Sequence, residues 1–287
     1  MDIGVKEVSK RAERIATLQS NYIKTGRGQG KGINYQPFIQ AHDNKVASLG
    51  WLTRHKGWKT QRVHHTLSEP ERKYLYFCEW LDGVIDIREQ WPLLPIERTI
   101  EIANQLGIKH AHVDGTPVVM TTDLRLTLEM KAGETDVIRT IKPKDRLDER
   151  TLELFEIERI YFEEAGVDWS IVTEEKIPQI LVKNVEWLAG AKYLDTRPGM
   201  DAEFVYLMSE YLLEEVLKDA GQTPIKTICL KTDKTHSLQG GTCMFVLQHM
   251  LATKRWSTDM ESRIIRDRDP LIIVSHEIQK DNTIHFA

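Results

Sequence analysis

The sequence predicts a mixed α/β domain followed by a mostly helical domain, and three observations support this prediction. The chain of 287 residues is long enough for two domains of ordinary size. As far as residue 173, segments that alternate like β-strands lie between amphipathic helical segments. A Glu-Glu-Lys-Ile-Pro stretch at 174–178 then interrupts the pattern, and helical periodicity dominates the rest. We therefore expect one domain at 1–173 and a second at 174–287.

The sheet and its helices are expected mainly between residues 68 and 173, after a short helical pattern at 1–20. Ser68 is a favourable N-cap for a helix whose apolar residues continue to Trp80. Ala132-Gly133-Glu134 is the expected turn of a hairpin. Four segments have the composition of strands: 84–90, 118–130, 137–142 and 169–173.

A strong amphipathic helix is expected at 148–165, between the third and fourth of these strands. Leu152, Phe155 and Phe162 fall on its core side, and Gly166 ends it. The order helix, strands, helix, strand predicts a mixed sheet with helices on its faces.

The second domain is expected to be a winged-helix-like module that contacts a partner protein, DNA or both. Its main amphipathic helix is expected at 237–253, and a short strand at 271–274 would form part of the wing. The other helices of this domain are expected at 178–189, 203–219 and 223–230.

Composition favours a cytoplasmic protein. Neither a signal peptide nor an apolar run of the roughly 20 residues needed to cross a bilayer is present in the sequence. The three cysteines, Cys78, Cys229 and Cys243, lack the spacing of a zinc site and are expected to be buried thiols.

The net charge of −4 conceals a basic N-terminal segment. Residues 1–65 hold 12 Lys or Arg and four acids, which gives +8 there and −12 for the remainder. A basic arm on an acidic body favours contact with the phosphates of a nucleic acid, although a solvated surface has the same composition. The residues expected to contact DNA are Arg27, Lys31, Arg62, His64 and His65.

The glycine-rich segment Gly26–Gly32 leaves two interpretations open. Its backbone could lie close to a phosphate, because glycine allows a close approach. It could equally be a flexible linker. No Lys-Ser/Thr pair ends it, so it is not a phosphate-binding loop of the Walker type.

Asp123 and Lys142 could share an active site that hydrolyses phosphodiesters. Such hydrolysis uses Mg²⁺ with carboxylate ligands and a nearby lysine. The restriction-endonuclease-like solution places an Asp on one strand and an acid-x-Lys on the next. A hairpin that is symmetric about Ala132-Gly133 brings Asp123 opposite Lys142, within a register step, and puts Thr140 on the same face as Lys142.

Glu129-Met130-Lys131 also matches the Glu-x-Lys pattern. In one continuous strand, however, six steps place Asp123 roughly 20 Å from Glu129, too far to share a metal ion. Lys142 is therefore preferred over Lys131, unless a kink or bulge near Thr127 shortens the distance.

Glu71 is a third candidate, and spacing alone favours a structural role for it. Ser68-x-x-Glu71 matches a capping box, in which the glutamate bonds back to the cap residue. His64 and His65 precede it, and paired histidines are more often packing or surface residues than ligands.

Taken together, the motifs resemble the TnsA family of transposition endonucleases over about residues 20–190. The segments that carry the resemblance are 26–30, 62–65, 67–71, 86–95, 120–123, 141–143, 148–153 and 185–188. The resemblance implies that Glu71, Asp123 and Lys142 are catalytic. It also implies Mg²⁺ bound by Glu71, Asp123 and Thr140, with Mn²⁺ able to substitute. It further implies nicking of transposon 5′ ends beside a DDE recombinase, TnsB, and an ATPase regulator, TnsC.

Thr140 departs from the pattern, because a member of the family carries Gln there and many nucleases of this fold carry Glu or Asp. A hydroxyl is a weaker Mg²⁺ ligand than a carboxylate, so Asp123, Glu71, a backbone carbonyl near Ile141 and water would hold the metal. The competing hypotheses are an autonomous nuclease of restriction or repair and a non-enzymatic winged-helix regulator.

Overall fold

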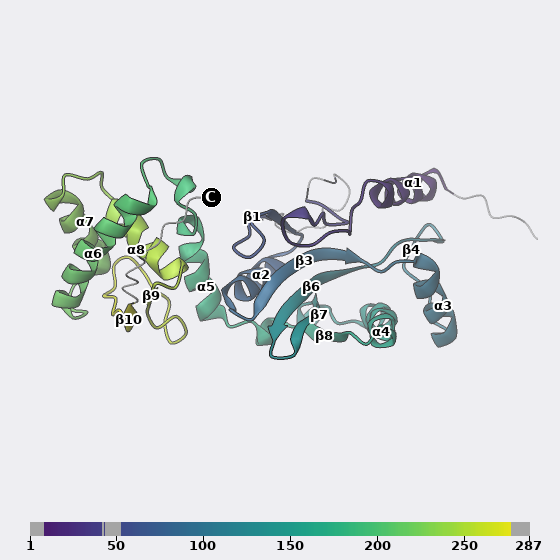
Figure 1. Cartoon of the computed structure of the whole chain (residues 1–287). Helices are drawn as coiled ribbons and strands as arrows, with labels where there is room; N and C mark the ends of the chain where they lie inside the picture. The colour runs from purple at the N-terminus through teal and green to yellow at the C-terminus, as the bar shows by residue number, and fades with distance from the viewer. Residues whose placement is uncertain (1–8, 42, 44–52, 277–287) are drawn as a thin grey trace, which may run out of the picture. The chain divides into compact units, whose positions relative to one another are not determined.

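The computed structural model describes residues 9–41, 43 and 53–276, and the chain divides into two compact units, 1–177 and 178–287. The first unit contains the sheet, and the second is mostly helical (Figure 1). Among the described helices, none has the length and apolar character needed to cross a bilayer. The first eight residues of the helix expected at 1–20 lie outside the described part of the chain, and α1 occupies Lys10–Lys24.

The first unit is built on a mixed four-stranded sheet, as the sequence predicted. Its order is β3-β6-β7-β8, with β3, β6 and β7 antiparallel and β8 parallel to β7. The crossover from β7 to β8 contains helix α4. The bounds are β3 Val84–Pro92, β6 Thr121–Met130, β7 Gly133–Ile141, β8 Asp168–Val172 and α4 Glu149–Glu164.

The β6–β7 hairpin turns one residue earlier than the sequence analysis placed it. Met130 pairs with Gly133, so Lys131 and Ala132 form a two-residue loop, and the ladder ends where Leu124 pairs with Arg139. Continuing that register would put Thr140, not Lys142, opposite Asp123. The exact pairing expected from a symmetric turn was therefore wrong, because Gly133 adopts φ 118° and belongs to the strand.

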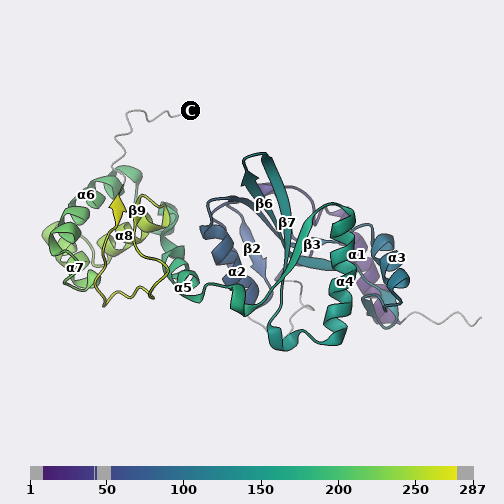
Figure 2. The ribbon, with the colours of Figure 1, turned by 90° about the horizontal axis from the view of Figure 1, so that it is seen from below.

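Helices cover both faces of the sheet (Figure 2). Helix α2, Glu69–Trp80, packs on one face, and Ser68 is its N-cap, as predicted. Helices α3, Ile96–Leu106, and α4 pack on the other, around a core that includes Ile138, Ile157 and Phe162. No helix was predicted at the position of α3.

One assignment within α4 was wrong. Leu152 was expected on the core side, but its side chain is 46% exposed, whereas Ile157 is fully buried. The buried face of α4 also includes Glu158, a charged residue that an amphipathic pattern assigns to solvent.

The N-terminal segment lies along the outer edge of β3. Gly32 N donates to the Asp86 carboxylate at 3.2 Å, and Phe38 N donates to the Gln90 carbonyl at 3.2 Å. Gly28 adopts φ 77° and touches Pro92 so closely that an added Cβ would lie 2.3 Å from its Cγ. The glycine-rich segment therefore packs against the sheet, a role that neither the phosphate-contact interpretation nor the linker interpretation predicted.

Short elements complete the first unit. A hairpin of β1 and β2 precedes α2, and a second small hairpin, β4 with β5, precedes β6. The short elements are η1 Gly32–Asn34, β1 Thr53–Lys56, β2 Val63–Thr66, β4 His112–Val113, β5 Thr116–Pro117, η2 Lys144–Arg146 and η3 Glu174–Lys176.

The second unit is arranged around helix α8, which is buried along most of its length and packs against α5, α6 and α7. The strand expected at 271–274 is not formed. Instead β9 and β10 pair antiparallel, with a two-residue ladder. The bounds are α5 Gln179–Leu188, η4 Ala189–Ala191, η5 Leu194–Thr196, α6 Ala202–Asp219, α7 Ile225–Thr235, α8 Thr242–Ala252, β9 Trp256–Ser257 and β10 Ser275–His276.

Candidate active site

Glu71 lies buried in the first turn of α2. Ser68 caps its backbone N–H, as the spacing predicts, but its carboxylate bonds to the Ser68 hydroxyl and to Leu67 N, one residue before the N-cap of the expected capping box. The Ser68 hydroxyl accepts from Glu71 N at 3.3 Å and donates to one carboxylate oxygen at 2.7 Å. The other oxygen accepts from Leu67 N at 2.9 Å. These bonds hold the carboxylate on the α2 side of the sheet. They do not prevent Glu71 from binding a metal ion, the role that the resemblance implies.

Asp123 lies where β6 and β7 stop pairing. Its carboxylate accepts a hydrogen bond from Ile141 N at 2.7 Å. The Asp123 side chain thus satisfies a backbone N–H just beyond the last ladder pair, Leu124 with Arg139. Because this bond fixes the carboxylate against β7, Asp123 sits beside the start of the segment that carries Lys142.

The charges of the three residues that the sequence analysis singled out act on one another. Burial raises the pKa of Glu71. Burial, followed by the negative charge of Glu71, raises the pKa of Asp123 well above its ordinary value, and the charge of Lys142 opposes this shift. Glu71, Asp123 and Lys142 therefore belong to one electrostatic site, with two mutually repelling carboxylates.

Thr140 is directed into a different group of side chains. Its hydroxyl donates to Glu158 at 2.5 Å, accepts from Trp169 Nε1 at 3.1 Å, and lies 3.1 Å from the Thr122 hydroxyl. Burial raises the pKa of Glu158, and its hydrogen bonds partly offset that rise. Thr140 is thus committed to a buried network on the α4 side, which does not fit the side-chain ligand role expected for it.

The two carboxylates fit a divalent cation. Carboxylates that repel each other in a partly dry site need a cation or a proton to be stable, and oxygen is the donor that Mg²⁺ prefers. No cluster of three or more His, Cys, Asp and Glu side chains with ligand geometry exists in the described residues. Glu71 and Asp123 could supply two carboxylate ligands to a Mg²⁺ ion, with main-chain oxygen, substrate and water in its remaining positions.

The Glu129-x-Lys131 alternative lies at the far end of the hairpin. Strand β6 runs unbroken from Thr121 to Met130, and Glu129 and Lys131 are exposed beside its turn. A register shift does occur near Thr127, but it lies in the partner strand β3, between Val84 and Asp86. The shift therefore does not shorten the path between Asp123 and Glu129.

Three of the five residues expected to contact DNA are buried in a structural cluster around Glu89. Arg62 donates to both Glu89 oxygens, at 2.7 and 2.5 Å, and His64 Nδ1 lies 2.8 Å from the same carboxylate. His65 N donates to it at 2.9 Å. Arg62, His64 and His65 are at most 8% exposed, so their side chains are not available to bind phosphate.

The remaining two, Arg27 and Lys31, lie in the N-terminal segment. Arg27 pairs with Asp43 at 2.6 Å and is mostly buried, whereas Lys31 is 68% exposed and lies 3.6 Å from Glu134. Only Lys31 of the five therefore presents its charge freely to solvent.

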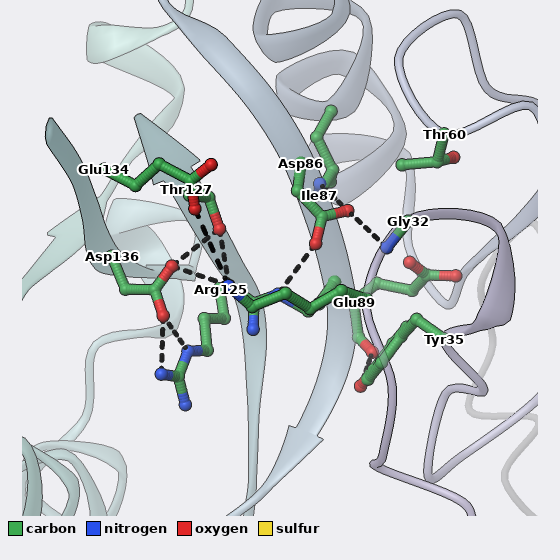
Figure 3. A network of polar contacts seen from close by, with 12 residues as sticks. Gly32, Tyr35, Thr60, Asp86, Ile87, Glu89, Arg125, Thr127, Glu134 and Asp136 are labelled. Carbon is green, nitrogen blue, oxygen red and sulfur yellow. Dashed lines mark hydrogen bonds and ion pairs between the residues drawn. The ribbon is translucent and has the colours of Figure 1, made fainter. Parts of the chain in front are cut away.

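A second polar cluster ties β3, β6 and β7 together on the sheet. Arg88 donates to Asp136 and to Thr127, both at 2.6 Å, and Arg125 pairs with the same aspartate. Figure 3 shows Asp136, Thr127 and Arg125 grouped on one side and Asp86 reaching Gly32 on the other. The sequence analysis did not identify this cluster, whose members are drawn from three strands.

The fold and the site together define a class of protein. A carboxylate from the first turn of α2, with a carboxylate and a lysine from the end of a hairpin in a mixed sheet, are groups that an endonuclease could use to hydrolyse phosphodiesters.

Comparison with known proteins identifies the family. Residues 82–174 match the model of the TnsA-like endonuclease N terminal, and residues 176–260 match that of the TnsA endonuclease C terminal. The chain is 36% identical over 231 residues to Transposon Tn7 transposition protein TnsA of Escherichia coli. The aligned region covers 80% of this chain and 81% of the relative. The chain therefore belongs to the TnsA family of transposition endonucleases.

Proposed function

We propose that this chain is a Mg²⁺-dependent endonuclease that nicks the 5′ ends of a transposon during cut-and-paste transposition. The observation that carries the proposal is the Glu71–Asp123 pair. Asp123 is fixed by Ile141 N beside the segment that carries Lys142, and burial together with the negative charge of Glu71 raises its pKa. Membership of the TnsA family supports the transposon end as the substrate.

The roles of the residues follow from their placement. Asp123, fixed by Ile141 N, and Glu71, fixed by the α2 cap, would hold Mg²⁺. When bound, this ion polarises the scissile phosphate and lowers the pKa of the attacking water. Lys142 would orient that water or stabilise the negative charge that develops on the phosphate. Mn²⁺, which also accepts oxygen ligands, is expected to substitute.

The two units take different roles in this proposal. The mixed sheet with its catalytic hairpin end supports a restriction-endonuclease-like domain with a basic N-terminal arm. The helical unit, with its short β9–β10 ladder, supports a winged-helix-like domain that contacts a partner or DNA. A TnsB-like recombinase would cut the 3′ ends, and a TnsC-like ATPase would regulate the assembly.

A strand-resolved cleavage assay tests the proposal. A labelled transposon end is incubated with Mg²⁺, the recombinase and this chain as wild type, Asp123→Ala or Lys142→Ala. We expect 5′ cleavage to fall at least about a thousandfold in both variants, because each loses several kcal/mol of transition-state stabilisation. The 3′ cut should persist.

Asp145→Asn is the matched control, because Asp145 is an exposed aspartate just beyond Lys142. It should leave both cuts unchanged. Undiminished 5′ cleavage by Asp123→Ala and Lys142→Ala would refute the site. Strong nicking by the isolated wild-type chain would instead favour an autonomous nuclease.

A further inference from the structure

Gln90 has a backbone conformation that its position in a strand does not explain. Six residues other than glycine have positive φ in the described part of the chain: Gln61, Gln90, Asp114, Ala220, Ser237 and Lys254. Five of them lie in turns or just beyond helix ends, where such conformations are common. Gln90, at φ 50°, lies inside β3 between two paired residues.

This irregularity occurs at the level of the active site. Glu89 pairs with Leu124 and Trp91 pairs with Thr122, so Gln90 lies opposite Asp123. Strand β3 is distorted at the same level at which the ladder between β6 and β7 ends.

The Gln90 side chain points to the catalytic carboxylate on α2. Its Nε2 donates to Glu71 Oε2 at 3.4 Å, and its Oε1 accepts from the Thr121 hydroxyl at 3.4 Å. The threonine contact sets the direction of the amide, because the oxygen that accepts from Thr121 leaves the NH₂ group facing Glu71. Gln90 is only 3% exposed, so water does not compete freely for these contacts.

A glycine would adopt this φ without steric cost, whereas glutamine is strained there. What glutamine adds is the amide. Residues held in unfavourable backbone conformations cluster at functional sites, where neighbouring structure compensates for the strain. Here the Gln90 carbonyl accepts from Phe38 N at 3.2 Å, which anchors the distorted residue to the N-terminal segment.

We propose that Gln90 is a positioning residue of the nuclease site, whose strained backbone directs its amide onto Glu71. The amide holds the Glu71 carboxylate in the orientation in which it and Asp123 bind one divalent cation. This inference rests on the proposed function of Glu71 and Asp123.

The test uses Gln90→Gly, which relieves the strain and removes the amide, and Gln90→Met, which keeps a side chain of similar length without the amide. Gln61→Gly is the matched control, because Gln61 is also a glutamine at positive φ (58°), but it lies exposed in the β1–β2 turn. Each full-length variant is assayed for 5′ cleavage with the recombinase. In parallel, the rise in melting temperature with Mn²⁺ is followed on the isolated chain.

We expect Gln90→Gly to melt at or above the wild-type temperature without metal, yet to cleave 5′ ends about tenfold more slowly. Its half-saturating Mn²⁺ concentration should rise about tenfold. Gln90→Met should show the same two losses even if its folding differs, and Gln61→Gly should show neither.

Wild-type cleavage and wild-type Mn²⁺ dependence in both Gln90 variants would overturn the inference. A loss of cleavage with unchanged Mn²⁺ dependence would also overturn it, because the amide would then act elsewhere than on metal binding. Asp123→Ala separates the two levels: if it too cleaves normally, the proposed site is wrong, and if it alone is inactive, only the role of Gln90 is wrong.

Discussion

Glu89 and Asp123 are acidic residues on neighbouring strands, one step apart in register, and their surroundings are opposite. Glu89 is bonded to Arg62 and His64; burial alone would raise its pKa, but these partners lower it far below the ordinary range. Asp123 has Glu71 and Glu158 as neighbours, and its pKa is raised. Burial raises the pKa of both residues, and they differ in their neighbouring charges. His64 and Arg62 outweigh burial at Glu89, whereas at Asp123 the negative charges of Glu71 and Glu158 add to it and Lys142 only partly opposes them.

This difference separates a structural carboxylate from a functional one. A compensated buried carboxylate can stabilise a fold once its partners are in place, whereas an uncompensated one costs stability unless a ligand supplies the charge. The Glu89 cluster fastens the β1–β2 hairpin to β3. In the proposed function, a divalent cation would supply the opposite charge to the Glu71–Asp123 pair.

The largest effect should come from breaking the compensated cluster. Arg62→Met leaves the Glu89 carboxylate buried with much less compensation, and we expect a loss of about 3–5 kcal/mol in the free energy of unfolding, measured by urea denaturation. The double variant Arg62→Met with Glu89→Leu should recover much of that stability. If the single variant were as stable as wild type, Glu89 would not depend on Arg62, and the contrast with Asp123 would fail.

The pH dependence of stability should have opposite signs at the two residues, with an effect of about 1.4 kcal/mol for each unit of pKa shift. The folded-state pKa of Glu89 is lowered, so its contribution is present above the unfolded pKa, roughly 4.3, and is lost as pH falls below it. The folded-state pKa of Asp123 is raised, so its cost at neutral pH is relieved as pH falls towards roughly 3.9.

Urea unfolding of metal-free protein across this range measures both effects. The stability of wild type relative to Asp123→Asn should rise as pH falls from neutral. The stability of wild type relative to Glu89→Gln should fall only below about pH 4. Equal slopes in the two comparisons would contradict the assignment of opposite environments.

The smallest effect should come from the exposed acid at the hairpin turn. Glu129→Ala and Lys131→Ala change solvated side chains beside the β6–β7 loop, so we expect stability to change by less than about 0.5 kcal/mol and 5′ cleavage to stay unchanged. A large loss of cleavage would move the active site to the Glu129-x-Lys131 pattern.

Local patterns predicted the elements that hold the site, but not the contacts between them. The Ser68 cap and the alternation in β6 and β7 depend on near neighbours, so α2 and the hairpin could be predicted from the sequence. The basic charge of residues 1–65 predicted DNA contacts at Arg62 and His64. Their partner Glu89 lies 27 and 25 residues away, so no local pattern shows that the two side chains are paired and buried.

The remaining errors have similar causes. The hairpin register depended on the backbone of Gly133, and composition alone does not show on which side of a turn a glycine lies. Gln90 and Glu158 gave no signal, because glutamine rarely adopts positive φ and a charged residue in an amphipathic helix is expected in solvent.

The contact between Gly28 and Pro92 gives the active site a dependence on a residue that carries no chemistry. A methyl group at position 28 would occupy the volume of the Pro92 ring, two residues from Gln90, so the strand end would have to move. Through β3, the proposed site is thereby linked to the absence of a side chain at position 28, at the edge of the sheet that β3 forms. A side chain at position 28 would therefore disturb the end of β3 beside Gln90, although Gly28 itself has no chemical role in the proposed reaction.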